Sequence, residues 1–202
     1  QAKTLFPYTT LFRSVYTQYG APEVLQVKQW ARPVPKNNEV LIKIHATAVN
    51  SGDCRLRRAD PFAVRFIFGL FKPSKPILGG VLSGTVEAVG ADVQAFRPGD
   101  EVFGATNLHF GAYAEYICLP ETAALTIKPE NLRHEEAATL PFGGATAYHF
   151  LQKANIQPGQ KVLIYGASGA IGQRHPAGLP AQVHRELRSS GRSASNVASA
   201  RA

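Results

Sequence analysis

A short apolar segment followed by closely spaced glycines constrains the fold of this chain more than any other feature. Residues Val162–Tyr165 (VLIY) lie between the turn-forming pair Pro158-Gly159 and the glycine loop GASGAIG of residues 166–172. A strand, a glycine loop and an expected helix are the opening of a βαβ unit. The sequence therefore predicts that an α/β domain starts at this point.

The residues that follow do not continue this pattern. Residues 173–202 contain no aromatic residue and no Lys, and Pro176 and Pro180 would interrupt the first turns of the expected helix. A frameshift just after the Gly172 codon would explain the change, because a neighbouring frame permits the helical sequence Ser-Ala-Ile-Gln-Leu-Ala. We therefore expect residues 173–202 to be an out-of-frame, disordered tail. An Arg/Ser-rich disordered segment that binds a partner is the alternative.

Most of the positive charge of the chain lies at its two ends. The net charge is +8, of which residues 1–14 carry +2 and residues 173–202 carry +4, leaving +2 for residues 15–172. Residues 4–14 (TLFPYTTLFRS) resemble the conceptual translation of a sequencing adapter, so we expect residues 1–14 to be a non-native segment. An aromatic strand is the alternative interpretation. Because the charge lies in these ends, it does not predict nucleic-acid binding.

The composition is otherwise that of a soluble globular protein. The chain is 45% apolar and 18% charged. It has no apolar run near the ~18 residues of a membrane-spanning helix, so no membrane partner is expected. Cys54 and Cys118 form no CxxC pair, and a reducing, cytoplasmic location follows as the expectation.

Short segments of alternating polarity dominate the first part of the chain. Residues 39–50 (EVLIKIHATAVN) alternate apolar and polar side chains, as a half-buried strand does. Three further strand candidates, separated by turn signals such as RPGD, are residues 84–90, 100–106 and 111–120. Their close spacing favours an all-β barrel or sandwich.

Two other segments predict helix. Residues 60–76 are apolar, aromatic and closed by proline, which indicates a helical turn and a loop. Residues 129–156 have Ala and Leu at helical spacings, with Glu135 and Glu136 near a helix start. The sequence therefore predicts a β domain followed by the beginning of an α/β domain.

The order of these segments resembles the medium-chain dehydrogenase/reductase family, on its zinc-lacking branch of quinone oxidoreductase-like and NAD(P)-dependent alcohol dehydrogenase-like members. Seven motifs within residues 15–172 carry the resemblance: VYTQYGAPEVLQ, EVLIKIHATAVNSGDCRLR, ILGGVLSGTVEAVG, FRPGDEVFG, GAYAEYICLP, LPFGGATAYHFL and GQKVLIYGASGAIG. The resemblance implies an α+β chain in which residues 15–127 are a GroES-like β-barrel catalytic domain. Residues 128–172 would begin a Rossmann dinucleotide-binding domain that is incomplete. The parent enzyme would be a homo-oligomer with its active site in the cleft between the domains.

The positions where zinc-dependent relatives bind the metal lack its ligands here. Those relatives have a ligand Cys three residues before an Asp, and a Gly-His-Glu in the next block. This chain has Asn50 before Asp53, and Gly79-Gly80-Val81 in the second block. A catalytic zinc needs about three protein ligands, so the resemblance implies an enzyme without metal. Cys54 lies one position past the motif, and we interpret it as a buried free thiol.

The glycine loop is the expected cofactor site. Its glycines would let the backbone turn tightly, so that the amides of the next helix face a pyrophosphate. A plain glycine turn is the alternative. The resemblance implies NADPH or NADH as the cofactor, no zinc, and a nicotinamide near Thr146. The expected cofactor-binding residues are Thr146, Gly166, Ala167, Ser168, Gly169, Ala170, Ile171 and Gly172.

The chemistry that the resemblance implies is hydride transfer from the nicotinamide to a small carbonyl, quinone or enone substrate. The catalytic candidates are Asn50, which would lie near the substrate, and Asp53, which fits the ordering of its loop better than the role of an acid. Tyr148 could donate a proton but fits a packed aromatic side chain better. His45 and His149 have no predicted partner.

Three hypotheses about function follow. The first is that this chain is an inactive fragment of such an oxidoreductase, since its α/β domain is incomplete. The second is that the β-barrel serves as a binding or interaction module without redox chemistry. The third, nucleic-acid binding through the basic ends, is the weakest.

Overall fold

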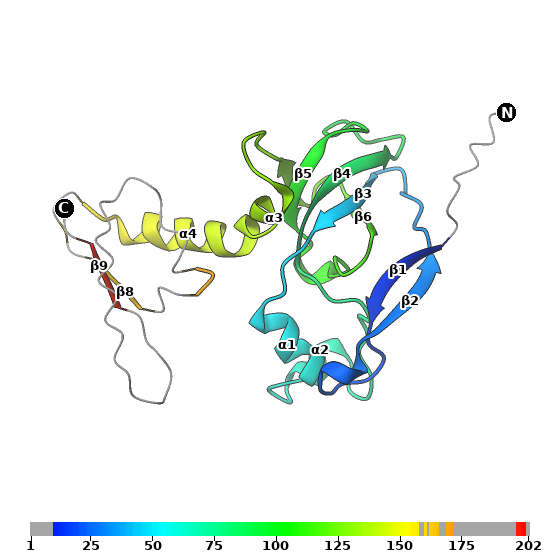
Figure 1. The fold of residues 1–202 in the computed structure, drawn as a ribbon, viewed down its shortest axis with the longest axis horizontal. Helices are drawn as coiled ribbons and strands as arrows, with labels where there is room; N and C mark the ends of the chain where they lie inside the picture. The colour runs from blue at the N-terminus through cyan, green and yellow to red at the C-terminus, as the bar shows by residue number, and fades with distance from the viewer. Residues whose placement is uncertain (1–9, 158–159, 161, 166–168, 172–196, 201–202) are drawn as a thin grey trace. The chain divides into compact units, whose positions relative to one another are not determined.

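Five antiparallel strands form the main sheet of the protein, in the order β6-β3-β4-β5-β7. We describe residues 10–157, 160, 162–165, 169–171 and 197–200 from a computed structural model (Figure 1). The chain divides into two compact units, Gln1–Ala138 and Thr139–Ala202.

The main sheet belongs to the first unit and curls on itself (Figure 1). Its strands are β3 (Glu39–Ala46), β4 (Val81–Val89), β5 (Glu101–Ala105), β6 (Tyr116–Pro120) and β7 (Ala124–Ile127). The apolar side chains that point inward are almost completely excluded from solvent and form one core: Val40, Ile42, Leu82, Val86, Val102 and Leu119. The strand predicted over residues 39–50 is present as β3 over Glu39–Ala46, and it supplies Val40 and Ile42 to this core. The predicted α+β class with a β-barrel-like first part is confirmed.

Two glycines allow neighbouring strands to come unusually close. A Cβ atom placed on Gly84 would lie 2.1 Å from the carbonyl oxygen of Lys43, and one on Gly104 would lie 2.1 Å from that of Ala124. The pairing of β3 with β4 also shifts its register between Ile44 and Ala46. Bulges and glycines of this kind bend a sheet, and they account for the tight curl.

A separate hairpin precedes the sheet. It consists of β1 (Thr10–Val15) and β2 (Gln26–Ala31), paired antiparallel from Thr10 opposite Ala31 to Val15 opposite Gln26. Leu11 and Val15 are buried, whereas every residue of β2 is exposed. Most of β1 lies in residues 4–14, the segment that resembles an adapter. Its residues from Thr10 onward form a strand, which was the alternative interpretation. The assignment of residues 1–14 as non-native stays a prediction.

Short helices occupy the connections of the first unit. They are η1 (Pro22–Val24), α1 (Ser51–Arg58), α2 (Val64–Phe68), η2 (Asn107–His109) and α3 (His134–Ala137). The last of these packs against β3 and β4 and belongs to the first unit. The domain boundary predicted after residue 127 stays a prediction. The segment of residues 60–76 has the predicted helical turn and loop. It leaves five large apolar side chains exposed: Phe62, Phe66, Ile67, Leu70 and Phe71.

The second unit contains η3 (Leu140–Gly144), which has π-helical geometry, α4 (Ala145–Ala154), β8 (Val162–Tyr165) and β9 (Val197–Ala200). The predicted strand Val162–Tyr165 is present as β8. It pairs antiparallel with β9, from Val162 opposite Ala200 to Tyr165 opposite Val197, and not with a parallel neighbour as the βαβ prediction implied. The unpaired edge of an apolar strand can pair with another extended segment, and for β8 that segment is Val197–Ala200. Within the described residues, no helix is long and apolar enough to cross a membrane.

Candidate active site

Asn50 lies at the start of α1, where its side chain caps the helix. Its Oδ1 accepts hydrogen bonds from the backbone N–H groups of Gly52 at 2.8 Å and Asp53 at 3.1 Å. In return, Oδ2 of Asp53 accepts a hydrogen bond from the backbone N–H of Asn50 at 3.2 Å. This reciprocal pair is a capping box. It fixes the side chain of Asn50 against the helix that it starts.

The carboxylate of Asp53 joins three segments that are distant in the sequence. The residue is 4% exposed. Besides its bond to Asn50, Oδ1 accepts from the backbone N–H of Gly79 at 3.3 Å and Oδ2 accepts from the hydroxyl of Tyr113 at 2.9 Å. Burial and then this hydrogen bond raise the pKa of Tyr113 well above its usual value, so its phenol stays a donor. These contacts tie the start of α1 to Gly79 and Tyr113, and the predicted role of Asp53 in the site stays a prediction.

The backbone opposite Asp53 has no room for a side chain at Gly79. This glycine has a φ of +99°, and a Cβ atom on it would lie 2.7 Å from a ring carbon of Tyr113. Its carbonyl oxygen accepts a hydrogen bond from the buried hydroxyl of Thr106 at 3.1 Å. Gly79-Gly80-Val81 is the segment where the zinc-dependent proteins considered above carry a ligand. Here the backbone N–H and the carbonyl of Gly79 make the hydrogen bonds, to Asp53 and Thr106.

Removing the Tyr113 hydroxyl tests the contact with Asp53 directly. The Tyr113→Phe variant is expected to lower the free energy of unfolding by about 1–2 kcal/mol, because it deletes one hydrogen bond to a buried carboxylate. Urea unfolding followed by circular dichroism measures the change. Tyr148→Phe is the matched control, since Tyr148 is 59% exposed on α4; equal losses in the two variants would contradict the expectation.

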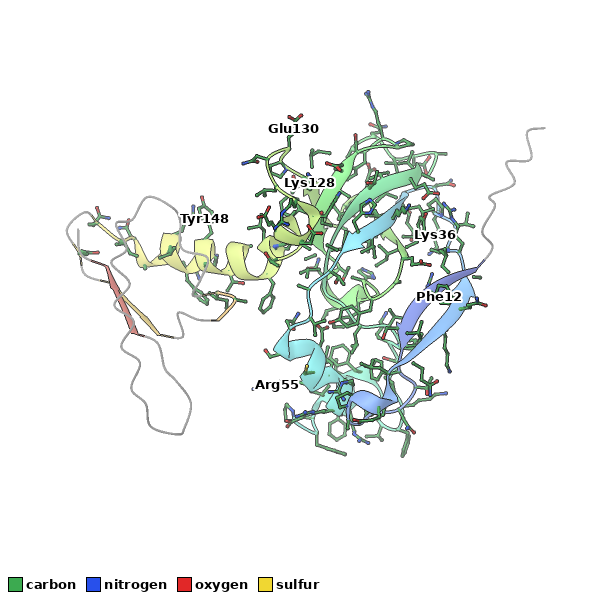
Figure 2. All side chains as sticks on the ribbon, in the orientation of Figure 1. Phe12, Lys36, Arg55, Lys128, Glu130 and Tyr148 are labelled. Atoms are coloured by element: carbon green, nitrogen blue, oxygen red, sulfur yellow. The ribbon has the colours of Figure 1, made fainter. Side chains whose placement is uncertain are left out.

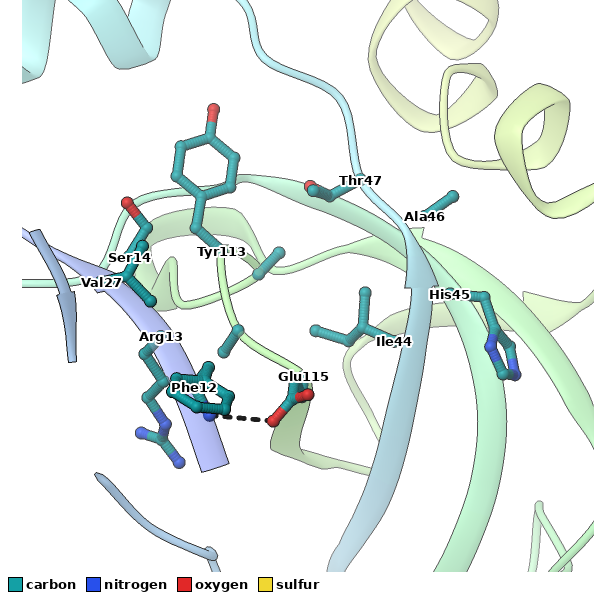
Figure 3. Close-up of a pocket in the computed structure, with 12 residues that line it drawn as sticks. Phe12, Arg13, Ser14, Val27, Ile44, His45, Ala46, Thr47, Tyr113 and Glu115 are labelled. Carbon is teal, nitrogen blue, oxygen red and sulfur yellow. Dashed lines mark hydrogen bonds between the residues drawn. The ribbon is translucent and has the colours of Figure 1, made fainter. Parts of the chain in front are cut away.

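An open pocket of about 350 Å³ lies in the first unit (Figure 3). One wall comes from β1, and another comes from the end of β3 and the residues that continue it to Thr47. Among the lining residues, the backbone N–H of Phe12 donates a hydrogen bond to Oε2 of Glu115 at 2.8 Å. The lining residues are Phe12, Arg13, Ser14, Val27, Ile44, His45, Ala46, Thr47, Ala112, Tyr113, Ala114 and Glu115. Sequence reasoning missed this pocket because its walls come from four separate segments.

The residues predicted to bind the cofactor belong to the second unit. The hydroxyl of Thr146 donates to the backbone carbonyl of Phe142 at 2.6 Å, one helical turn back. Residues 169–171 form a bend and a turn, and they are exposed. The predictions for Gly166, Ala167, Ser168 and Gly172 lie outside the described residues. Tyr148 projects from α4 and shares a hydrogen bond with Gln152 (Figure 2), so it is not the packed aromatic residue that we predicted.

The described residues contain no group of three or more His, Cys, Asp or Glu side chains that could hold a metal ion. Cys54 is exposed, which corrects the prediction of a buried thiol. The correction follows from the periodicity of α1, whose buried side chains are Asp53 and Arg57. Cys54 therefore lies on the outward part of this helix. Cys118, on β6, is half-buried and likewise unpaired.

Comparison with known proteins supports this structural description. Residues 36–129 match the family model of the alcohol dehydrogenase GroES-like domain. The 2-methylene-furan-3-one reductase of Solanum lycopersicum is 36% identical over 171 residues, covering 78% of this chain and 41% of the relative. The quinone oxidoreductase of Homo sapiens is 35% identical over 161 residues, covering 77% of this chain and 45% of the relative. A mitochondrial NAD(P)H oxidoreductase of Bos taurus is 32% identical over 188 residues, covering 84% and 46%.

Solved structures give the same relationship. The quinone oxidoreductase from Coxiella burnetii aligns with a TM-score of 0.66 at 30% identity, covering 74% of this chain and 47% of that one. The JamJ enoyl reductase aligns with a TM-score of 0.72 at 30% identity, covering 81% and 49%. The chain thus spans less than half the length of the relatives that it matches. The sheet β3–β7 and these matches together identify residues 36–129 as an alcohol dehydrogenase GroES-like domain, in a chain that is similar to quinone oxidoreductases and enoyl reductases of the medium-chain dehydrogenase/reductase family.

Proposed function

We propose that this chain carries the substrate-side domain, and the start of the nucleotide-binding domain, of a zinc-independent NAD(P)H-dependent oxidoreductase. Its substrates would be small carbonyl compounds, quinones or enones. The proposal is supported by relatives that are named quinone oxidoreductase and 2-methylene-furan-3-one reductase. The parent enzyme would be a homo-oligomer. The unpaired Cys54 and Cys118 support a reducing, cytoplasmic location.

The donor groups around Asn50 carry the proposal of zinc independence. Asn50 replaces a potential thiolate ligand, and its Oδ1 already accepts two backbone hydrogen bonds. The carboxylate of Asp53 accepts three hydrogen bonds. Gly80 and Val81 offer no side-chain ligand at the second position. A catalytic zinc needs about three protein ligands, and this set does not provide them.

The cofactor of the proposed enzyme is NADPH, with NADH as the alternative. The residues that would hold it are Thr146 and the glycine loop of residues 166–172. When bound, the cofactor would supply hydride from its nicotinamide ring. The turn at residues 169–171 is compatible with a phosphate-binding loop. On the substrate side, Asn50 and Asp53 would shape the wall of the site, since both side chains are held by hydrogen bonds.

We further propose that the 202-residue chain does not turn over substrate. Residues 173–202 lack the apolar helix pattern that should follow the glycine loop, and the amides at the start of that helix are the ones expected to face the pyrophosphate. The expected result is no oxidation of NADPH or NADH by the purified chain with quinones or enals. Zinc measured by mass spectrometry is expected to be far below one ion per chain.

The activity assay and the zinc measurement test separate parts of the proposal. The human quinone oxidoreductase, assayed in parallel, shows that the substrates and cofactors are competent. Clear cofactor turnover by this chain would overturn the proposed inactivity. Stoichiometric zinc that withstands dialysis against a chelator would overturn the proposed zinc independence.

The pocket favours a second candidate function, in which the first unit is a non-catalytic binding module. A cavity of about 350 Å³ is lined entirely by residues 12–115, so its formation does not need the nucleotide-binding part. Binding of a small ligand to the whole chain with the same affinity in the presence and absence of NADPH would favour this candidate. Affinity that depends on the nucleotide would favour the oxidoreductase.

A further inference from the structure

The segment that contains α2 exposes five large apolar side chains to solvent. The exposed fraction is 73% for Phe66, 75% for Ile67 and 88% for Phe71. We call these three residues, together with Phe62 and Leu70, the α2 face. Single exposed apolar side chains are normal on a protein surface, but several close together mark a site of protein or membrane interaction.

Contacts on the other side of α2 hold this face outward. The ring of Phe68 packs edge-on against that of Phe110, with centroids 5.8 Å apart. The hydroxyl of Tyr19 donates a hydrogen bond to the backbone carbonyl of Gly69 at 2.8 Å. The backbone N–H of Ser74 returns to the carbonyl of Phe68 at 2.7 Å. The exposure of the α2 face is therefore fixed by the packing of its own helix and of the turn after it.

Positive charge is concentrated in the same part of the chain. Residues 55–75 hold six Lys and Arg side chains and one acidic side chain, that of Asp60, which gives a net charge of +5. The other residues of 15–172 hold nine Lys and Arg against twelve Asp and Glu, a net charge of −3. Four of the six cations are exposed: Arg55, Arg58, Lys72 and Lys75.

These cations are not neutralised within the part of the chain that the structure describes. The ion pairs between described residues all lie outside residues 55–75. Arg65, which belongs to α2, stacks on aromatic rings instead. Its guanidinium carbon lies 4.7 Å from the ring centroid of Tyr19 and 5.2 Å from that of Phe62. One cation thus lies directly against a residue of the α2 face.

The exposed cations of α1 belong to the same end of the first unit as the α2 face. Helices α1 and α2 lie next to each other there (Figure 1). The backbone N–H of Gly20 donates to the carbonyl of Arg57 in α1 at 3.0 Å, and its neighbour Tyr19 bonds to Gly69 at the end of α2. A single partner that covers this end can therefore contact both the apolar and the cationic side chains.

The combination fits the surface of an anionic lipid bilayer. A bilayer offers an apolar layer to Phe, Ile and Leu side chains, and anionic headgroups to Lys and Arg. A free phosphate or an acidic peptide would pair with the cations but would leave most of the α2 face in water. The sequence led us to expect no membrane partner, because no segment is long enough to span a bilayer. A surface-bound protein needs no such segment.

We propose that the α2 face and the cations of residues 55–75 dock the chain on the surface of an anionic membrane. The α2 face enters the boundary between headgroups and acyl chains, and the exposed cations lie at the level of the lipid phosphates. This docking surface belongs to the first unit and does not depend on the proposed redox function.

Sedimentation of the whole chain with lipid vesicles tests the proposal. Affinity is expected to be at least about tenfold higher for phosphatidylcholine vesicles that contain about 30% phosphatidylserine than for phosphatidylcholine alone. Raising the salt concentration from about 0.1 M to about 0.5 M should weaken the binding, because salt screens the headgroup charge. No binding to the anionic vesicles, or equal binding to both kinds, would overturn the proposal.

Two pairs of substitutions separate the docking surface from the overall positive charge. Lys72→Gln with Lys75→Gln is expected to weaken binding to the anionic vesicles roughly 25-fold, about fivefold for each cation. Arg188→Gln with Arg192→Gln removes the same charge from the basic residues 173–202 and should change the affinity by less than about threefold. Equal losses in the two pairs would mean that net charge alone drives binding, and would overturn the proposal.

The apolar part of the surface is tested at Phe71. Phe71→Ser is expected to weaken vesicle binding about fivefold or more, because the ring no longer enters the bilayer. Val34→Ser is the matched control, since Val34 is 83% exposed and lies outside the α2 face; it should bind as the unchanged chain does. A dimer in solution that Phe71→Ser dissociates would assign the face to a second copy of the chain and overturn the proposal.

Fluorescence quenching distinguishes insertion from adhesion to headgroups. Trp30 is the only tryptophan of the chain, so Phe71→Trp and Val34→Trp are each combined with Trp30→Phe. Lipids with brominated acyl chains should quench the tryptophan at position 71 and leave the one at position 34 unquenched. Absence of quenching at position 71 in vesicle-bound protein would overturn the proposed insertion.

Discussion

Replacing Asp53 by Ala is expected to lower the free energy of unfolding by about 3–4 kcal/mol. The substitution removes the acceptor of three hydrogen bonds in a residue that is 4% exposed. It leaves the buried backbone N–H of Gly79 and the partly buried hydroxyl of Tyr113 without their acceptor, and a buried group left so costs about 1–3 kcal/mol. The capping box at the start of α1 is lost as well. Urea unfolding followed by circular dichroism measures the change.

Two companion variants sharpen this test. Asp53→Asn keeps one acceptor oxygen and the shape of the side chain, so about half of the loss is expected to be recovered. Asp92→Ala removes an exposed carboxylate and should change the stability by less than about 0.5 kcal/mol. If Asp53→Ala were as stable as Asp92→Ala, the contacts of Asp53 would not order the site.

The second large effect is expected at Gly84 of β4, which faces the backbone of Lys43 on β3. Gly84→Ala would place a Cβ atom 2.1 Å from the carbonyl oxygen of Lys43 and 2.9 Å from its carbonyl carbon. Both obstacles are backbone atoms, so no change of rotamer relieves the overlap and the strands must separate. We expect a loss of about 3 kcal/mol or more, comparable to severe overpacking in a core.

Gly80→Ala is the matched control for this variant. A Cβ atom on Gly80 meets nothing within 4 Å, so its effect on stability should stay within about 0.5 kcal/mol. Thermal unfolding of the two variants side by side measures the difference. Equal midpoints would mean that the close approach of β3 and β4 does not need a glycine.

The first unit shows which structural features a sequence can predict. Strand β3 was predicted from its alternating apolar and polar residues, and β4, β5 and β6 were predicted as short segments between turn signals. Helix α1 was missed, because residues 47–50 were taken as the end of the preceding strand. The Asn50-Ser-Gly-Asp53 pattern is a recognisable helix start, so this helix could have been found from the residues alone.

Other contacts could not be found in this way. Tyr113 lies 60 residues from Asp53 along the chain, and no local pattern links the two. The pairing of β8 with β9 was equally unpredictable, since the sequence of Val162–Tyr165 is compatible with a parallel or an antiparallel neighbour. The family resemblance supplied the fold class that these local signals leave open. The roles of Asn50, Asp53, Thr146 and the glycine loop stay predictions.

Cys54 is exposed on α1, so a label attached to it would lie near Asn50 and Asp53. Burial raises the pKa of Cys118 to about 11, so near neutral pH that thiol has very little of the nucleophilic thiolate form. A maleimide dye should therefore attach selectively to Cys54. The label would lie beside Asp53 and one helical turn from Asn50, where its fluorescence could report on whatever molecule enters there.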